Sequence, residues 1–364
     1  MSANQNKKRP VHAGSSHEQP HQPSPAAPPR SRKHLSRTKG WMLLLSLGLA
    51  LTAFAYLLFG ESYIRPALML QALGGSGAVE HLVIVREFRL PRLLVGILAG
   101  AALSVAGTLL QGVFRNPLAA PDLVGISGGA AAAASAFLTF RPASLSIHWL
   151  PAVAMAGAAL MSVIVYSAAW KRGVTPARLI LVGIGMGALT TAFTNTILLL
   201  GSVYTATDAY IWLTGTIYGT SWQHVWTLLP WTALFLIIAL YHGRSLNVLM
   251  LSDETASGLG SHVERSRRGL IAISVGLAGS AVAIGGSIGF VGLIGPHIAR
   301  QLVGPSAKRL IPVSALCGSL IVVLADFVAR TAFLPFDIPV GVFTSAVGAP
   351  FFIYLLYRNR RGIR

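Results

Sequence analysis

Long stretches without charge, separated by short polar segments, set the pattern of this chain. Nine runs contain no Lys, Arg, Asp or Glu: residues 41–60, 93–114, 123–140, 142–170, 179–207, 209–241, 269–299, 310–325 and 338–357. A helix needs about 20 apolar residues to cross the hydrocarbon core of a bilayer. The pattern therefore predicts an all-α polytopic membrane protein.

Two of these runs are too long for a single span. As one helix, the run 269–299 would reach about 46 Å, whereas the hydrocarbon core is about 30 Å thick. Its glycine-rich part, residues 285–292, marks the expected turn and leaves a shorter return helix through Pro296 and His297. The run 209–241 begins with polar and aromatic residues, so we expect its first half to lie at the outer surface or to re-enter before the sixth span. About ten spans result.

The basic residues favour one orientation for these spans. With an inner N-terminus, 23 of the 29 Lys and Arg fall in inner segments and six in outer segments. Cytoplasmic loops of membrane proteins carry an excess of Lys and Arg. The distribution therefore predicts that both termini are cytoplasmic, in a plasma or inner membrane.

Composition agrees with a lipid environment. Hydrophobic residues make up 53% of the chain and charged residues 11%, with a mean hydropathy of +0.63, whereas soluble domains carry about 25% charged residues. The net charge of +18 would suit a nucleic-acid binder, but most basic residues lie in short loops between apolar runs, so no nucleic-acid partner is expected. The single cysteine, Cys317, excludes an intrachain disulfide and a cysteine-based metal site.

Three parts of the chain differ in composition. Residues 1–40 are rich in Pro, Ser, His and Gln and carry eight Lys and Arg, which predicts a disordered basic cytoplasmic tail. Residues 41–358 hold the ten spans and form the expected transmembrane domain. Residues 359–364 are expected to be a short cytoplasmic C-terminal tail.

Several functional signatures are missing from the sequence. It contains no Gly-x-x-x-x-Gly-Lys-Ser/Thr motif, so any ATP must be bound by another chain. Acidic residues are scarce within the predicted spans, which argues against an ion-coupled secondary transporter. We find no catalytic dyad or metal-ligand pattern, and we expect neither enzymatic activity nor a cofactor.

Three arginines at the outer end of the second span form the first candidate site. Arg86, Arg89 and Arg92 flank Pro91, which suits the first turn of a helix. They either snorkel to the membrane interface or receive acidic side chains of an extracytoplasmic partner. Arg330 lies at the outer end of the ninth span, and we expect Asp326, one helical turn earlier, to orient it.

Two inner segments are the other candidates. Residues 114–122 contain two prolines that stop a helix, either as an ordinary tight connection or as a functional one. Residues 251–260 predict a short cytoplasmic helix with Ser252 as its N-cap and Asp253 in its first turn. This helix is either a surface element without a partner or a coupling element that inserts into a soluble motor domain.

Five motifs in consistent order resemble the FecCD family of ABC permeases, which includes ferric siderophore, haem and vitamin B12 importers. They are RLPR (89–92), NPLA (116–119), GGSIGFVGLIGPHIAR (285–300), ADFVAR (325–330) and IPVGVFTSAVGAP (338–350). The resemblance runs from about residue 41 to residue 358. It implies a type II ABC importer permease that pairs with a second permease subunit, identical or different, two ATP-binding subunits and an extracytoplasmic substrate-binding protein.

The resemblance also implies roles for particular residues. The docking arginines for glutamates of the binding protein are Arg89, Arg92 and Arg330. The cytoplasmic gate residues are Asn116, Leu118 and Thr175. The residues coupled to the ATPase are Ser252, Asp253, Glu254, Ala256, Leu259 and Gly260. The expected cargo is an iron–siderophore complex, with haem or vitamin B12 as the alternative within the family and an independent secondary transporter or channel as the alternative outside it.

Overall fold

The computed structural model describes residues 31–142, 144–171 and 174–359, and every regular element within them is helical. The longer helices are α1 (Ser31–Leu58), α4 (Leu90–Val113), α5 (Ile126–Phe140), α6 (Leu150–Ala169), α7 (Pro176–Leu200), α9 (Trp222–Tyr241), α12 (Val263–Gly285), α13 (Val291–Val303), α14 (Ala307–Thr331) and α15 (Val340–Asn359). The shorter ones are α2 (Pro66–Leu73), α3 (Val79–Leu82), α8 (Val203–Leu213), α10 (Gly243–Leu249) and α11 (Asp253–Gly258). A π-helical turn, Val83–Arg89, joins α3 to α4 without a break.

The described helices match the ten predicted spans in order. Seven of them are long and apolar enough to cross a membrane, and Ile126–Phe140 and Val340–Tyr354 are shorter apolar helices. The remaining predicted span, the eighth in chain order, corresponds to α13, the return helix. The expected all-α membrane fold is therefore confirmed.

The first helix starts earlier than predicted. It begins at Ser31 instead of Trp41, so the predicted disordered tail 1–40 is wrong for residues 31–40. A helix already nucleated in the apolar run extends at little cost through Arg and Lys, which are good helix formers. The rest of the predicted tail, residues 1–30, and residues 360–364 of the predicted C-terminal tail lie outside the described residues.

Both predicted breaks in the long runs are present. Helix α12 ends at Gly285, and the chain turns at Gly286, where φ is +65° and a Cβ atom would lie 2.0 Å from the carbonyl oxygen of Trp212. Only glycine tolerates that position. In the run 209–241, α8 ends at Leu213 and α9 starts at Trp222, so the first part is separate from the span.

Helix α4 forms the centre of the bundle. It is buried along most of its length and packs against α14, α12, α13 and α9. Small residues allow this close packing: a Cβ atom on Gly107 would lie 1.8 Å from the carbonyl oxygen of Gly292, and one on Gly100 2.3 Å from that of Gly318.

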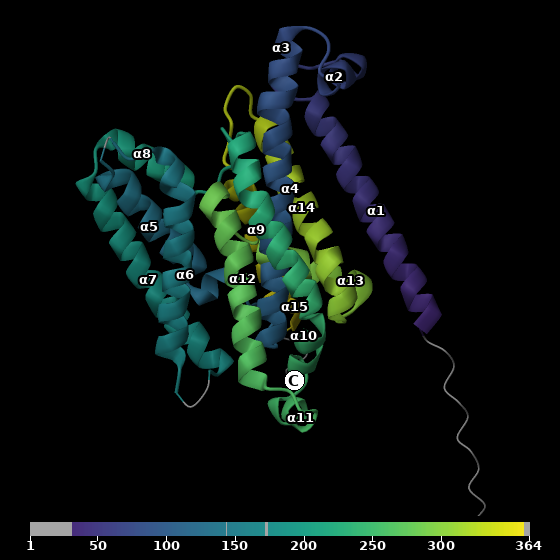
Figure 1. The fold of residues 1–364 in the computed structure, drawn as a ribbon, viewed down its shortest axis with the longest axis vertical. Coiled ribbons are helices and arrows are strands. Elements are labelled where there is room, and N and C mark those ends of the chain that lie inside the picture. Colours follow the sequence, from purple (N-terminus) through teal and green to yellow (C-terminus); the bar gives the residue numbers. More distant parts are fainter. Residues whose placement is uncertain (1–30, 143, 172–173, 360–364) are drawn as a thin grey trace, which may run out of the picture.

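Two parts of the bundle stand to either side of these central helices (Figure 1). Helices α5 to α8 stand together on one side, and α1 lies on the opposite side against α14. Helices α2, α3 and α8 lie at one end of the bundle, hereafter the α2 end, and α10 and α11 lie at the other, the α11 end.

Candidate functional site

The three predicted docking arginines come together at the α2 end, and we call them the arginine cluster. Arg89 ends the π-helical turn before α4, Arg92 lies in the first turn of α4, and Arg330 lies in the last turn of α14. All three are buried, with between 5% and 9% of their surface exposed. A buried guanidinium requires hydrogen-bond acceptors for its donors and compensation for its charge.

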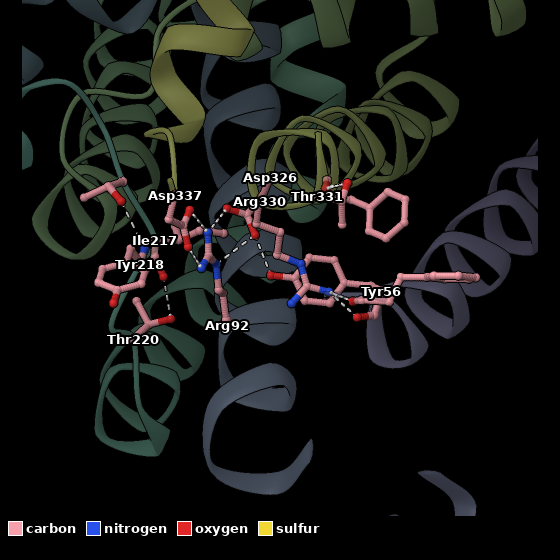
Figure 2. A network of polar contacts seen from close by, with 12 residues as sticks. Tyr56, Arg92, Ile217, Tyr218, Thr220, Asp326, Arg330, Thr331 and Asp337 are labelled. Carbon is pink, nitrogen blue, oxygen red and sulfur yellow. Dashed lines mark hydrogen bonds and ion pairs between the residues drawn. The ribbon is translucent and has the colours of Figure 1, made fainter. Parts of the chain in front are cut away.

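Arg92 obtains both from two aspartates (Figure 2). Its Nε and Nη2 donate to the two oxygens of Asp326 at 2.9 and 2.7 Å, and its Nη2 and Nη1 donate to those of Asp337 at 2.8 and 2.5 Å. The Tyr56 hydroxyl donates to Asp326 at 2.5 Å. The expectation that Asp326 orients Arg330 is therefore wrong, because Arg92 occupies both of its carboxylate oxygens.

Arg89 and Arg330 bind main-chain carbonyls at the end of α1 instead. Arg89 donates to Leu57 at 2.7 Å, Leu58 at 3.1 Å and Ser62 at 2.5 Å. Arg330 donates to Tyr56 and, at 2.7 Å, to Phe59, and its guanidinium lies 3.7 Å from the centre of the Tyr56 ring. The last carbonyls of a helix lack partners within the helix and carry partial negative charge. The two arginines therefore cap α1.

Capping gives acceptors to several donors of these two arginines but does not neutralise their charges. Among the described residues, neither Arg89 nor Arg330 has a carboxylate within ion-pair distance. The Nε atom of Arg330 is buried and has no hydrogen-bond partner there. Arg89, Arg92 and Arg330 carry three positive charges against the two negative charges of Asp326 and Asp337, so these five side chains together carry one net positive charge.

The arginine cluster lines a hollow of about 500 Å³. Glu61, Phe88, Tyr218 and Phe336 also line it, as does the partly exposed Asp337. The arginines do not project from the surface as a rim, so an anionic group has to enter this hollow to reach them. The net positive charge of the cluster and its two aspartates would attract such a group.

At the α11 end, the predicted gate residues lie at helix termini. Asn116 follows α4, and its side-chain Oδ1 accepts a hydrogen bond from the backbone N–H of Leu118 at 2.9 Å. Thr175 is the residue before α7 and is exposed. Within the described residues, no hydrogen bond joins Thr175 to Asn116 or Leu118.

The short helix predicted at 251–260 is present as α11. Ser252 caps it by accepting a hydrogen bond from Thr255 N at 3.1 Å, as the sequence predicts. Ala256 is buried, whereas Leu259 is 65% exposed, and Gly260 has a φ of +77°. The exposed Leu259 gives this helix an apolar contact surface.

Asp253 ties α11 to two other segments. It accepts hydrogen bonds from Arg267 of α12 at 3.1 and 3.2 Å and one from Arg115, which follows α4. Arg115 also donates to Leu251 O at 2.7 Å. Burial alone would raise the pKa of Asp253, but the hydrogen bonds and positive charges of Arg267 and Arg115 outweigh it and lower the pKa.

Arg267 continues this chain of contacts to the start of α7. It donates to Glu264 at 2.8 Å and to Val174 O at 3.2 Å, and Glu264 accepts from Val174 N at 3.3 Å. Asp253 is thus connected through Arg267 to Val174, the residue before Thr175. It also binds Arg115, the residue before Asn116, directly. Sequence reasoning missed Arg115, Arg267 and Glu264, although the i, i+3 spacing of Glu264 and Arg267 was a visible sign of an ion pair.

Comparison with known proteins gives one consistent result. The FecCD transport family model matches residues 48–358. The probable siderophore transport system permease protein YfhA of Bacillus subtilis is 43% identical over 88% of this chain and 96% of its own length. The iron(3+)-hydroxamate import system permease protein FhuG of the same organism is 43% identical over 87% of this chain and 96% of its own length. A solved metal-chelate type ABC transporter in an inward-facing conformation superposes with a TM-score of 0.77 at 29% identity, covering 88% of this chain and 99% of that chain.

Proposed function

The chain belongs to the FecCD transport family, and from this premise we propose that it is the membrane-spanning permease subunit of an ABC importer for an iron–siderophore complex. Its role is transport rather than catalysis. The observation that carries the cargo assignment is the 43% identity to the YfhA siderophore permease over 88% of the chain. Iron would pass through already chelated, as substrate.

A second cargo has support of its own. The cobalamin import system permease protein BtuC of Halobacterium salinarum is 44% identical over 75% of this chain and 73% of its own length. Cobalamin is therefore the alternative substrate.

In the proposed complex the α2 end faces outward and the α11 end faces the cytoplasm. The excess of Lys and Arg in the segments assigned to the inside supports this orientation. A second permease subunit completes the pathway, two ATP-binding subunits contact the inner face, and a binding protein delivers cargo to the outer face.

The arginine cluster is the proposed docking site for that binding protein. Within the described part of the chain Arg89 and Arg330 form no ion pair, so an incoming glutamate could accept charge-assisted hydrogen bonds from both in the hollow. Arg92 already has two carboxylate partners, Asp326 and Asp337. Its proposed part in docking is to hold the wall of the hollow in place while the other two arginines receive the acid.

Helix α11 is the proposed coupling helix. Its exposed Leu259 and the acidic residue Glu254 would contact an ATP-binding subunit. Movement of α11 would reach the gate residues Asn116, Leu118 and Thr175 through Asp253 and its two arginines. Nucleotide binding would then shift the permease between outward-open and inward-open populations.

Reconstitution tests this function. The permease is placed in liposomes together with an ATP-binding subunit and a binding protein encoded next to its gene. Uptake of radioactive ferric hydroxamates, ferric citrate, haem and cobalamin is then measured with and without ATP. We expect ATP-dependent uptake of a ferric chelate that also requires the binding protein. Uptake by the permease alone, driven by an ion gradient, would contradict the proposal.

A further inference from the structure

An apolar groove runs between α6 and α9, with α12 packed against both helices. Figure 1 shows α12 between α6 and α9, where the α5–α8 group meets the centre of the bundle. The groove has a volume of about 450 Å³. No part of the proposed transport mechanism uses it.

Most of the groove is lined by apolar side chains. Trp231 and Phe235 of α9 stack at 6.1 Å between ring centroids, and the Phe235 ring lies so close to Gly276 of α12 that a Cβ atom there would be 2.3 Å away. Met155 and Val163 of α6 and Val275 of α12 add aliphatic surface. This part of the groove suits a hydrocarbon chain.

The end of the groove nearest α11 is polar. Tyr166 and Ser167 come from the last turn of α6, and Arg268 comes from the second turn of α12. Tyr and Trp are enriched where a membrane protein crosses the interface between lipid and water, and Trp170 stands beside Tyr166 at 5.8 Å between ring centroids. The groove is therefore apolar where the acyl chain of a lipid would lie and polar where its head group would lie.

Arg268 is an exposed arginine at the polar end of the groove. The nearest acid along the helix, Glu264, binds Arg267, Tyr166 and Val174. Within the described residues, Arg268 has no carboxylate at ion-pair distance, and its side chain is exposed. A positive charge at the mouth of the groove favours an anion there.

The length of the groove fits one leaflet. From Met155 to Ser167 along α6, a rise of 1.5 Å per residue corresponds to about 18 Å, and half of the hydrocarbon core is about 15 Å. The groove thus extends from the interface to about the middle of the membrane.

We propose that this groove is a binding site for one anionic phospholipid of the inner leaflet. An acyl chain lies along α12 between α6 and α9, and the phosphate accepts hydrogen bonds from Arg268 and the hydroxyl of Ser167. Basic pockets between membrane helices on the cytoplasmic side commonly hold anionic head groups. The site rests on the orientation proposed above but not on the identity of the cargo, and the bound lipid would join the α5–α8 group to the central helices.

Native mass spectrometry of the purified full-length chain tests the site. The protein in detergent is incubated with equal amounts of phosphatidylglycerol and phosphatidylcholine, and retained lipid is counted at increasing collision energy. We expect several-fold preference for phosphatidylglycerol, loss of that preference in R268Q, and retention in R265Q, a matched change at an exposed arginine of α12 that does not line the groove.

A second variant separates charge from shape. Ala272 lines the groove and is exposed to it, so A272F would narrow the site while leaving Arg268 in place. Size-exclusion chromatography confirms that each variant remains monodisperse. Lower lipid retention in A272F supports the proposal. Equal retention of both lipids by the unchanged protein, or equal effects of R268Q and R265Q, would overturn it, and neither outcome depends on which cargo is transported.

Discussion

Asp253 and Arg267 form an ion pair between α11 and the second turn of α12, with the carboxylate half exposed and the guanidinium buried. The buried arginine also binds Val174, and the same carboxylate binds Arg115. One acidic side chain thus connects the short helix at the α11 end with the segment after the central helix α4 and, through Arg267, with the segment before α7.

Replacing Asp253 with Asn should uncouple ATP hydrolysis from uptake. The change keeps the shape of the side chain but removes charge-assisted hydrogen bonds, each worth about 1.5–3 kcal/mol. Since about 1.4 kcal/mol corresponds to a tenfold change in an equilibrium, the loss of even one such bond should lower the uptake per ATP hydrolysed about tenfold. This ratio is measured in proteoliposomes that contain the complete transporter. The matched control is S257A, a change on the same helix outside these contacts, and equal behaviour of the two variants would contradict the role of Asp253.

Acid should loosen the same contact. The pKa of Asp253 is lowered in the folded protein, so its stabilising contribution is present above the pKa of the unfolded chain, about 3.9, and is lost as the pH falls through the folded value. We expect hydrogen exchange in residues 251–260 to become faster over that acidic range after correction for intrinsic rates. D253N should show no such additional pH dependence.

Removing the charge of Arg330 should weaken docking of the binding protein. R330Q replaces one of the three guanidinium groups that line the hollow with a neutral, shorter side chain. We expect affinity for the cargo-loaded binding protein to fall at least tenfold, measured by surface plasmon resonance on the reconstituted complex. R65Q, at an exposed arginine outside the hollow, should bind normally.

Removing Arg92 should damage folding rather than docking alone. In R92M the buried Asp326 and the partly buried Asp337 lose their shared partner, and breaking a buried ion pair costs about 3–5 kcal/mol. We expect low yield and a lower midpoint of thermal unfolding in detergent. D337N should be milder because it leaves the Arg92–Asp326 pair intact, and a wild-type midpoint for R92M would show that the network is not structural.

A single methyl group at Gly107 should destabilise the bundle. Its Cβ atom would meet the carbonyl of Gly292 at 1.8 Å, and overpacking of this kind costs about 1–3 kcal/mol. The expected result for G107A is a lower thermal midpoint and reduced yield. G185A is the control, because no atom lies within 4 Å of a Cβ atom at that glycine in α7.

Features encoded by neighbouring residues were predictable from the sequence. The run lengths correspond to the ten helices, the glycines at 285–292 to the turn between α12 and α13, and Ser252 to the cap of α11. Each depends on hydrophobic length, backbone freedom or a cap within a few residues. The start of α1 at Ser31 was missed because the composition of a segment does not show how far a helix that is already nucleated extends into it.

Only the tertiary structure decided which charges meet. In sequence, Asp326 had Arg330 one turn away, yet it binds Arg92, because the packing of α4 against α14 brings that guanidinium, far away along the chain, to both carboxylate oxygens. The burial of the arginine cluster in a hollow, the connection of Asp253 to Arg115 and Arg267, and the groove between α6, α9 and α12 also join distant segments. The length of each apolar run determines where a spanning helix forms, whereas the partners of a buried charge depend on how those helices pack.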